Sequence, residues 1–259
     1  MNKSFIRTNN YNRIIAAVNA LVNRDASLPG LGLFYGNWGY GKTEAVEHFY
    51  GQSETFYMRA QESWNTRRYL EEMCAVMKTV PNNYRLDRLT DQVISGMRRW
   101  KRPFFIDEAD YLFHNKGRML NIVRDIHDLT RVPIVLIGME EICERLQRYG
   151  QFFSRILPAG IVEFQPISPP EIIMVTKEWT GLSIGMEAAE IFCRYVQGDF
   201  RYVVGYLLTI EDACKTNNVT AVSAKLVETV VNKAEKLTKR LYGIEENKEI
   251  RVLGKTVQK

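Results

Sequence analysis

Residues 31–43 read Leu31-Gly32-Leu33-Phe34-Tyr35-Gly36-Asn37-Trp38-Gly39-Tyr40-Gly41-Lys42-Thr43. A short apolar run, typical of a buried strand, leads into a glycine-rich loop that fits G-x-x-x-x-G-K-[ST] completely. Glycines let backbone N–H groups turn inward around phosphate oxygens, and a helix that starts at the loop adds the positive end of its dipole. The stretch therefore predicts a strand, a phosphate-binding loop and a helix, in that order.

The side chains of this loop predict which parts of a nucleotide they hold. Lys42 is expected to reach the β- and γ-phosphates of ATP, and the Thr43 hydroxyl is expected to ligate Mg²⁺. The loop chemistry gives no reason for residues as bulky as Trp38 and Tyr40. The predicted nucleotide-binding residues are Gly36, Asn37, Trp38, Gly39, Tyr40, Gly41, Lys42, Thr43 and Glu44.

Two adjacent carboxylates, Asp107 and Glu108, close another apolar run 65 residues after Lys42. We expect Asp107 to hold Mg²⁺ together with Thr43, and Glu108 to orient and deprotonate an attacking water, as phosphoryl transfer demands. The tetrapeptide Asp107-Glu108-Ala109-Asp110 also matches the signature motif of a helicase family, D-E-A-D. We discount that interpretation, because the helical residues after 167 do not supply a second motor domain.

Strand and helix patterns alternate along the first two thirds of the sequence. Strands are expected at 31–35, 55–59, 103–106, 133–137 and 161–164, and helices at 11–22, 42–50, 65–78, 84–99, 116–129 and 140–148. This alternation predicts an α/β fold with a parallel five-stranded sheet flanked by helices. From Glu171 onward only helical spacing is found, which predicts a small C-terminal α-helical lid. The expected domains are a core at 1–166, a lid at 167–240 and a flexible basic tail at 241–259.

Composition narrows the class of protein. Hydrophobic residues make up 46% and charged residues 25% of the 259-residue chain, which excludes a disordered chain. No apolar run approaches the ~20 residues of a membrane helix, and the N-terminal residues lack a signal core. Four widely spaced cysteines are expected to be reduced thiols. We therefore expect a cytoplasmic protein without a membrane partner.

The formal net charge of +5 is unevenly distributed. Residues 67–102 hold nine Lys and Arg against four Asp and Glu, and residues 225–259 hold nine against five. Two basic regions on a mildly acidic body favour a polyanionic partner, with solvated helix faces as the alternative. The C-terminal region is expected to be an amphipathic lid helix with Val227, Val230, Val231, Ala234 and Leu237 on its apolar stripe. The tail after it is either a plain flexible end or a segment that docks on a partner.

Three further positions are candidates for sensing the nucleotide. The strand at 133–137 is followed by the tip Gly138-Met139-Glu140. Met139 cannot polarise a phosphate, so we expect slow hydrolysis unless Glu140 takes that role. Arg155, after Gln151-Phe152-Phe153-Ser154, suits an arginine finger delivered to a neighbour's ATP. Arg145, Arg148 and a plain surface arginine are the alternatives. Arg201, in Gly198-Asp199-Phe200-Arg201, could reach back from the lid to the γ-phosphate or could simply begin a helix. Glu108, Arg155 and Arg201 are thus the predicted catalytic residues.

Taken together, these motifs resemble the AAA+ ATPases, and among them the transposition regulators typified by the phage Mu B protein, TnsC and IstB. The resemblance runs from about residue 8 to about residue 240. It rests on the loop with Glu44 and Ala45, on Phe105-Ile106-Asp107-Glu108-Ala109-Asp110, on Val135-Leu136-Ile137-Gly138-Met139 and on Phe153-Ser154-Arg155. The sequence shows no counterpart of the N-terminal helix-turn-helix module of Mu B, so the resemblance does not extend to the target discrimination assigned to that module.

The resemblance implies an ATP-dependent, largely sequence-non-specific DNA-binding protein that assembles into filaments or rings on duplex DNA. Such proteins select target sites, recruit and stimulate a DDE transposase, sometimes with a targeting factor, and leave DNA after hydrolysis. The implied partners here are duplex DNA, other copies of the chain and a transposase, and the implied cofactors are ATP and Mg²⁺.

The expected DNA contacts lie beyond the second strand and at the turn that follows the next helix. Arginine, amide and hydroxyl side chains are the usual hydrogen-bond donors to DNA phosphates, and such contacts position a duplex without reading its bases. The dense basic run Arg98–Arg102 is expected at the opposite end of the sheet from ATP, as a subunit-contact or surface segment. The predicted DNA-binding residues are Arg59, Gln61, Asn65, Arg67, Arg68, Lys78, Thr79, Asn82, Tyr84 and Arg85.

Other functions stay open at this point. A helicase loader or replication initiator would share the ATPase motifs and the DNA contacts. A P-loop regulatory module acting on protein partners only would show no DNA dependence. A small-molecule kinase is disfavoured, because no acceptor pocket can be recognised in the sequence.

Overall fold

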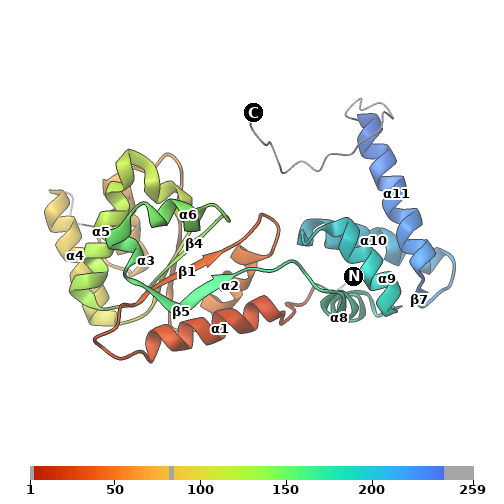
Figure 1. Ribbon diagram of the computed structural model, residues 1–259, viewed down its shortest axis with the longest axis horizontal. Helices are drawn as coiled ribbons and strands as arrows, with labels where there is room; N and C mark the ends of the chain where they lie inside the picture. The colour runs from red at the N-terminus through yellow and green to blue at the C-terminus, as the bar shows by residue number, and fades with distance from the viewer. Residues whose placement is uncertain (1–2, 82–84, 242–259) are drawn as a thin grey trace.

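A computed structural model describes residues 3–81 and 85–241 of the chain, with the side chains of 115 and 234–241 outside the description. Its centre is a five-stranded parallel sheet in the order β2-β3-β4-β1-β5 (Figure 1). The strands are β1 (Leu31–Tyr35), β2 (Phe56–Arg59), β3 (Phe104–Asp107), β4 (Ile134–Gly138) and β5 (Ile156–Glu163). The predicted α/β class with a parallel five-stranded sheet is therefore confirmed.

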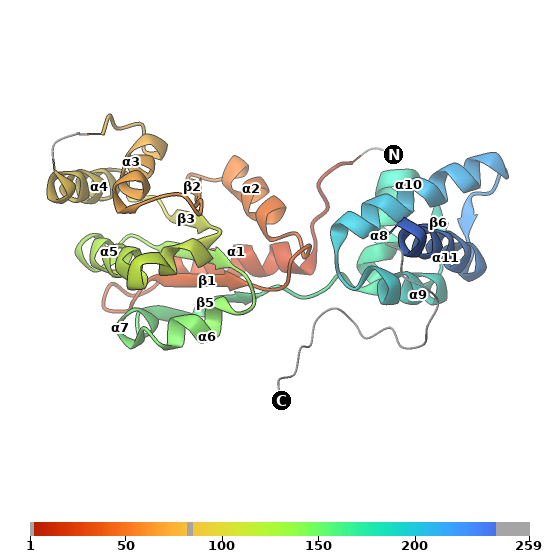
Figure 2. The ribbon, with the colours of Figure 1, turned by 90° about the horizontal axis from the view of Figure 1, so that it is seen from above.

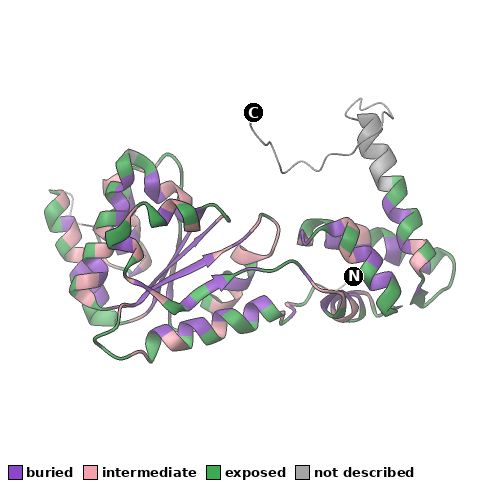
Figure 3. Cartoon of the chain, in the orientation of Figure 1, coloured by how far each residue is buried: buried purple, intermediate pink, exposed green. Residues whose placement is uncertain are grey.

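Helices cover both faces of this sheet, because neighbouring strand residues point to opposite sides. Phe34 and Phe105 pack with α1 and α2, whereas Leu33 and Ile106 pack with α3, α4 and α5. The three central strands, β1, β3 and β4, are buried almost throughout (Figure 3). The elements of this domain are α1 (Asn9–Val22), α2 (Lys42–Gln52), α3 (Thr66–Val76), α4 (Leu86–Trp100), the 3₁₀ helix η1 (Ala109–Phe113), α5 (His114–Thr130), α6 (Ile142–Gln147) and α7 (Gly150–Phe153).

The C-terminal domain, hereafter the lid, is mainly helical, as expected. Its core contains the buried Val227, Val230 and Val231, which confirms the part of the predicted stripe that the structure describes. The expectation of helices alone is wrong, because β6 (Ser183–Ile184) and β7 (Ala221–Val222) pair in parallel. Two-residue strands have no periodicity to detect. The lid helices are α8 (Pro169–Thr180), α9 (Met186–Val196), α10 (Phe200–Thr216) and α11 (Ala224–Leu241).

The fifth strand begins five residues before its predicted start at 161. Pro158 and Gly160 hide its first half from a propensity argument, since both weaken a strand. The proline is tolerated because β5 lies at the edge of the sheet and pairs with β1 alone. The pairing between β1 and β5 also shifts register between Leu31 and Leu33.

The N-terminal segment joins the two domains. Ile6 is buried in the lid core, and Trp179 Nε1 of α8 donates to Ser4 O at 2.7 Å. Glu171 Oε1 accepts from Asn9 N at 2.8 Å, so the first turn of α1 is tied to the first turn of α8. The boundary predicted at residues 166 and 167 stays a prediction, as does the tail at 241–259, which lies almost wholly outside the described residues.

No helix of the described chain combines the length and apolar character needed to cross a bilayer. The four cysteines are free, with Cys74 and Cys214 buried. Burial raises the pKa of the Cys74 thiol to about 11, so this thiol stays protonated near neutral pH.

Candidate functional site

The phosphate-binding loop lies where β1 ends and α2 begins. Gly39 and Gly41 have φ angles of +77° and +78°, which glycine adopts without the strain that a side chain would cause. Lys42 Nζ donates to Gly36 O at 2.6 Å and to Asn37 O at 2.8 Å, so the ammonium lies inside the loop. Burial lowers the pKa of Lys42, and the nearby Asp107 opposes part of that shift. Glu44 is exposed on the first turn of α2.

Asp107 and Thr43 come together at the carboxyl ends of β3 and β1. Thr43 Oγ1 donates to Asp107 Oδ2 at 2.8 Å, and Glu108 N donates to Asp107 Oδ1 at 2.8 Å. The carboxylate is almost completely buried, with Asp107 3% exposed. A hydroxyl and a carboxylate are the hard oxygen ligands that Mg²⁺ prefers, so this pair fits the ion expected from the sequence.

Tyr57 is a further member of this cluster that was not predicted. Its hydroxyl donates to Asp107 Oδ2 at 2.9 Å, from the strand beside β3. Burial and the Asp107 carboxylate raise the pKa of Tyr57, so its hydroxyl remains a donor. The only sequence signal was a tyrosine on a strand that pairs with the carboxylate strand, and the pairing itself could not be predicted.

Glu108 is paired with a candidate DNA-binding residue. Its backbone has a φ of +53°, and its Oε1 accepts from Arg59 Nη2 at 2.9 Å. This hydrogen bond raises the pKa of Arg59. The side chains of Arg59 and Glu108 are 57% and 34% exposed, so both remain accessible to a ligand.

At the tip of β4, where a polar side chain could sense the nucleotide, the thioether of Met139 faces the loop. Met139 Sδ lies 3.7 Å from Lys42 Nζ, and Met139 N donates to Asp110 Oδ2 at 2.8 Å. Asp110 also accepts from Arg145 Nη1 at 3.1 Å, so this rival to the arginine finger is held within its own subunit. Glu140 is exposed.

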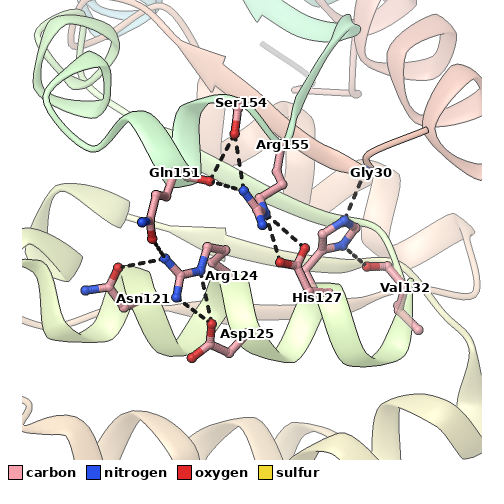
Figure 4. Close-up of polar contacts among 10 residues, drawn as sticks. Gly30, Asn121, Arg124, Asp125, His127, Val132, Gln151, Ser154 and Arg155 are labelled. Carbon is pink, nitrogen blue, oxygen red and sulfur yellow. Dashed lines mark hydrogen bonds and ion pairs between the residues drawn. The ribbon is translucent and has the colours of Figure 1, made fainter. Parts of the chain in front are cut away.

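Arg155 lies beside the start of β1, at the opposite end of that strand from the loop. Figure 4 shows its guanidinium close to Gln151 and Ser154. Its carbonyl accepts from Leu31 N at the start of β1, whereas the loop follows the end of β1. Arg155 Nε bonds both carboxylate oxygens of Asp128, at 2.8 and 3.1 Å, and Nη1 donates to Gln151 O at 2.7 Å. A strand of five residues spans about 16 Å, so Arg155 cannot reach the nucleotide of its own subunit.

Arg201 approaches the loop from the lid. Figure 2 shows the first turn of α10 facing the connection between β1 and α2. Phe200 N donates to Gly39 O at 2.9 Å, and Arg201 Nη2 pairs with Asp199 Oδ2 at 2.8 Å. A Cβ atom on Gly39 would lie 2.3 Å from the Asp199 carboxylate, so the lid packs directly against the loop. Both predicted partners, the loop and Arg201, are thus brought together.

A hollow opens beside the loop, between α1, α2 and the lid. Its walls are largely aromatic, and its polar groups are few: Phe5, Tyr40, Phe164, Trp179 and Phe200 line it together with Thr8, Asn10 and Glu44. No sequence pattern predicted this hollow, because its walls come from five separate parts of the chain.

The predicted DNA-binding residues are surface groups where the structure describes them. Arg59 ends β2, Gln61 follows it, and Asn65 caps α3 by accepting from Arg68 N at 3.0 Å. Several of the arginines have acidic partners: Arg67 with Glu71 at 3.6 Å, Arg68 with Glu72 at 3.1 Å and Arg85 with Asp87 at 3.1 Å. Lys78 and Thr79 follow α3, whereas Asn82 and Tyr84 lie outside the described residues.

The loop and both carboxylates fall within a recognised protein family. Residues 24–146, which include all of these groups, match a family model described as an AAA domain. This part of the chain is therefore similar to an AAA-type P-loop domain.

Particular relatives agree with that class. The chain is 28% identical over 144 residues to a "Potential ATP-binding protein" of Staphylococcus aureus, over 52% of this chain and 51% of the relative. The chain thus spans about half the length of this curated relative. It also resembles the Aeropyrum pernix ORC1 protein solved in complex with DNA, with a TM-score of 0.56, 15% identity and coverage of 91% of this chain and 66% of that one.

A third similar protein is domain III of the Thermotoga maritima replication initiation protein DnaA. The TM-score is 0.52 at 15% identity, with 88% of this chain and 93% of that one covered. At such identities the two structural likenesses establish the fold alone: a parallel five-stranded sheet flanked by helices, followed by a mainly helical domain.

Proposed function

We propose that this chain binds ATP with Mg²⁺, assembles on duplex DNA in its ATP-bound form and hydrolyses ATP to disassemble. The observation that carries the proposal is the 2.8 Å contact between Thr43 Oγ1 and Asp107 Oδ2, with Glu108 next in sequence and Lys42 on the same loop. This contact gathers the phosphate-binding, metal-binding and water-activating groups at one edge of the sheet. The name of the S. aureus relative supports the ATP part.

The residues would divide the reaction between them. Lys42 neutralises phosphate charge, and Thr43 and Asp107 hold Mg²⁺, which supplies further charge neutralisation when bound. Glu108 orients a water and accepts its proton as the water oxygen attacks the γ-phosphorus and the bond to ADP breaks, leaving ADP and phosphate. The aromatic hollow beside Gly41 suits a flat, apolar base such as adenine.

Arg155 is proposed to act on a neighbouring subunit. Arg155 lies too far from the loop to contact the ATP of its own subunit. It can therefore contribute to hydrolysis only at the ATP of another copy. Such a contact makes assembly and nucleotide state depend on each other. Asp128 and Gln151 hold the guanidinium until that neighbour arrives.

DNA is proposed to bind along the end of β2 and the α3–α4 region. The likeness to a fold solved with DNA and the excess of basic residues at 67–102 support this part. Arg59 joins this surface to Glu108, so DNA phosphates that attract Arg59 would release the carboxylate. We further propose, from the resemblance to the transposition regulators, that the assembly selects target sites and recruits a DDE transposase.

A replication initiator or helicase loader is the second candidate, and the likeness to DnaA domain III favours it. A pull-down with the DNA-bound chain as bait distinguishes the two functions. A transposition regulator should recover a transposase, and a replication initiator or helicase loader should recover a helicase. A protein-only regulator predicts neither partner nor any DNA dependence.

The first test is duplex DNA binding by fluorescence anisotropy with ATP, ADP or no nucleotide, at two salt concentrations. Tight, salt-sensitive binding with ATP alone, abolished in Lys42→Ala, is the expected result. Reversing the charge of Arg68 and Lys78 should weaken binding and flatten the log–log salt dependence by about 0.9 for each phosphate that is no longer neutralised. The control is Lys177→Glu on the exposed side of α8. Binding that ignores the nucleotide would contradict the proposal.

A further inference from the structure

Trp38 is a bulky residue of the phosphate-binding loop that does not line the hollow proposed for the base, so the proposed function does not explain its size. Its side chain stands in the middle of the loop and is 55% exposed, so it is not a core residue. An exposed indole next to a predicted phosphate site is free to contact a neighbouring side chain.

The neighbour is Arg201 of the lid. The guanidinium carbon of Arg201 lies 5.3 Å from the centroid of the Trp38 ring, within the range of a cation–π contact. Arg201 Nε and Nη2 also bond the Asp199 carboxylate at 3.0 and 2.8 Å. The guanidinium is therefore held by a carboxylate along one edge and by an indole on its face.

This arrangement orders a side chain that would otherwise move freely. Arg201 is 69% exposed, and an exposed arginine has many rotamers whose loss costs binding free energy. Asp199, whose side chain is 6% exposed, cannot itself move far, because it packs against Gly39. Within the described chain, the contacts with Asp199 use Nε and Nη2 and leave Nη1 to donate to an incoming anion.

Tyr40, the second bulky residue of the loop, also packs against the start of α10. A Cβ atom on Gly198 would lie 2.5 Å from Tyr40 Cε1 and 2.6 Å from Pro166 Cβ, so Tyr40 fills the space beside the glycine that precedes Asp199. The hydrogen bond from Phe200 N to Gly39 O lies between the two aromatic contacts. Trp38 and Tyr40 thus both contact the turn that begins α10.

We propose that Trp38 is a positioning residue: its indole holds the Arg201 guanidinium over the phosphate-binding loop and thereby sets how strongly the chain prefers ATP to ADP. This inference rests on the proposed nucleotide binding and deepens it. A preordered arginine adds to the affinity for the additional phosphate of ATP without adding to the affinity for the groups that ADP shares with it.

The test is a double-mutant cycle on nucleotide affinity. Dissociation constants for fluorescent ATP and ADP analogues are measured for wild type, Trp38→Ala, Trp38→Phe, Arg201→Ala and the double variant Trp38→Ala/Arg201→Ala. Trp38→Ala should reduce the ratio of ATP to ADP affinity about fivefold, the equivalent of a solvent-exposed cation–π contact. Trp38→Phe should recover most of the ratio, since a phenyl ring keeps the interaction.

Two controls separate positioning from damage to the loop. In the Arg201→Ala background, Trp38→Ala should change the ratio no further, because the residue through which it acts is gone. Trp100→Ala removes another exposed tryptophan with arginines 5.4 and 5.2 Å from its ring centroid, remote from the loop, and should leave the ratio unchanged. Melting temperatures confirm that each variant is folded.

Three results would overturn the inference while leaving nucleotide binding intact. These are an unchanged ratio in Trp38→Ala, an equal loss of ATP and ADP affinity, and the same effect of Trp38→Ala with and without Arg201. A wild-type chain that binds ATP no better than ADP would also overturn it. Wild-type protein that binds neither nucleotide, or binds both as well after Lys42→Ala, would instead refute the proposed function.

Discussion

Arg59 and Glu108 form an ion pair, with Arg59 Nη2 lying 2.9 Å from Glu108 Oε1 across the ends of β2 and β3. The pair joins a candidate DNA-binding residue to the carboxylate proposed to activate water. A carboxylate held by a guanidinium is a weaker base and is turned from its water. The geometry therefore allows DNA to regulate hydrolysis through a single contact.

Arg59→Gln tests that link. Freed from the ion pair, Glu108 should promote ATP hydrolysis faster without DNA, by roughly tenfold, a part of the ~10²–10⁴ that a positioned base contributes. The stimulation by DNA should shrink by a similar factor. Steady-state phosphate release with and without duplex DNA measures both. The control is Lys215→Gln, which breaks the ion pair with Glu211 on α10, away from the proposed DNA surface. Basal hydrolysis at or below the wild-type rate would refute the link.

Tyr57→Phe should weaken the metal site without removing a ligand. The hydroxyl donates to Asp107 Oδ2, and a hydrogen bond to a charged group contributes about 1.5–3 kcal/mol, so the unfolding free energy should fall by about that amount. The Mg²⁺ concentration at half-maximal ATP hydrolysis should rise, because Asp107 loses orientation. Denaturant unfolding and a Mg²⁺ titration measure the two effects. Tyr50→Phe, on the neighbouring ring 5.8 Å away, should change neither.

Mixing two inactive variants tests whether Arg155 acts between subunits. Arg155→Ala keeps an intact nucleotide site, and Lys42→Ala keeps an intact Arg155. Each alone should lose at least about 10³-fold in assembly-dependent hydrolysis. A mixture should regain part of the activity, because some interfaces combine an intact loop with an intact Arg155. A mixture no more active than its parts would exclude action in trans.

His127 predicts a pH dependence of stability. It is fully buried, accepting from Gly30 N at 3.1 Å while its Nδ1 bonds Val132 O at 2.9 Å, and burial lowers its pKa from the ordinary 6.5. Since the unfolded chain binds the proton more readily, stability is full above pH 6.5 and is lost as the pH falls toward the lowered folded value.

The measurement is the unfolding free energy of wild type and His127→Gln at several pH values from neutral downward through the ordinary histidine pKa. Wild type should lose stability over this range, and the variant should lose less, although it starts from a lower value. Parallel curves for the two proteins would show that His127 does not titrate on unfolding.

Much of the fold was predictable from local patterns. The first four strands and α1 to α5 lie within a few residues of their expected places, because periodic apolar residues and side-chain caps such as Thr8 and Asn65 act over one or two turns. The start of β5 and the pair β6–β7 were missed, since an edge strand tolerates Pro158 and a two-residue strand depends on its partner rather than on its own residues.

The candidate site also contains residues that local sequence could predict and residues that it could not. Lys42, Thr43, Asp107 and Glu108 were identified from spacing, because a P-loop and a carboxylate strand need particular residue types at fixed positions. Local order along the chain was thus enough to predict the sheet and the loop, whereas the roles of these four residues stay a prediction.

Folding alone decided which distant side chains meet. It brought Tyr57 to Asp107, Arg59 to Glu108, Asp128 to Arg155 and Trp38 to Arg201. The members of each pair lie 27 or more positions apart in the sequence. Their contacts therefore depend on strand order and domain packing, which no local pattern contains.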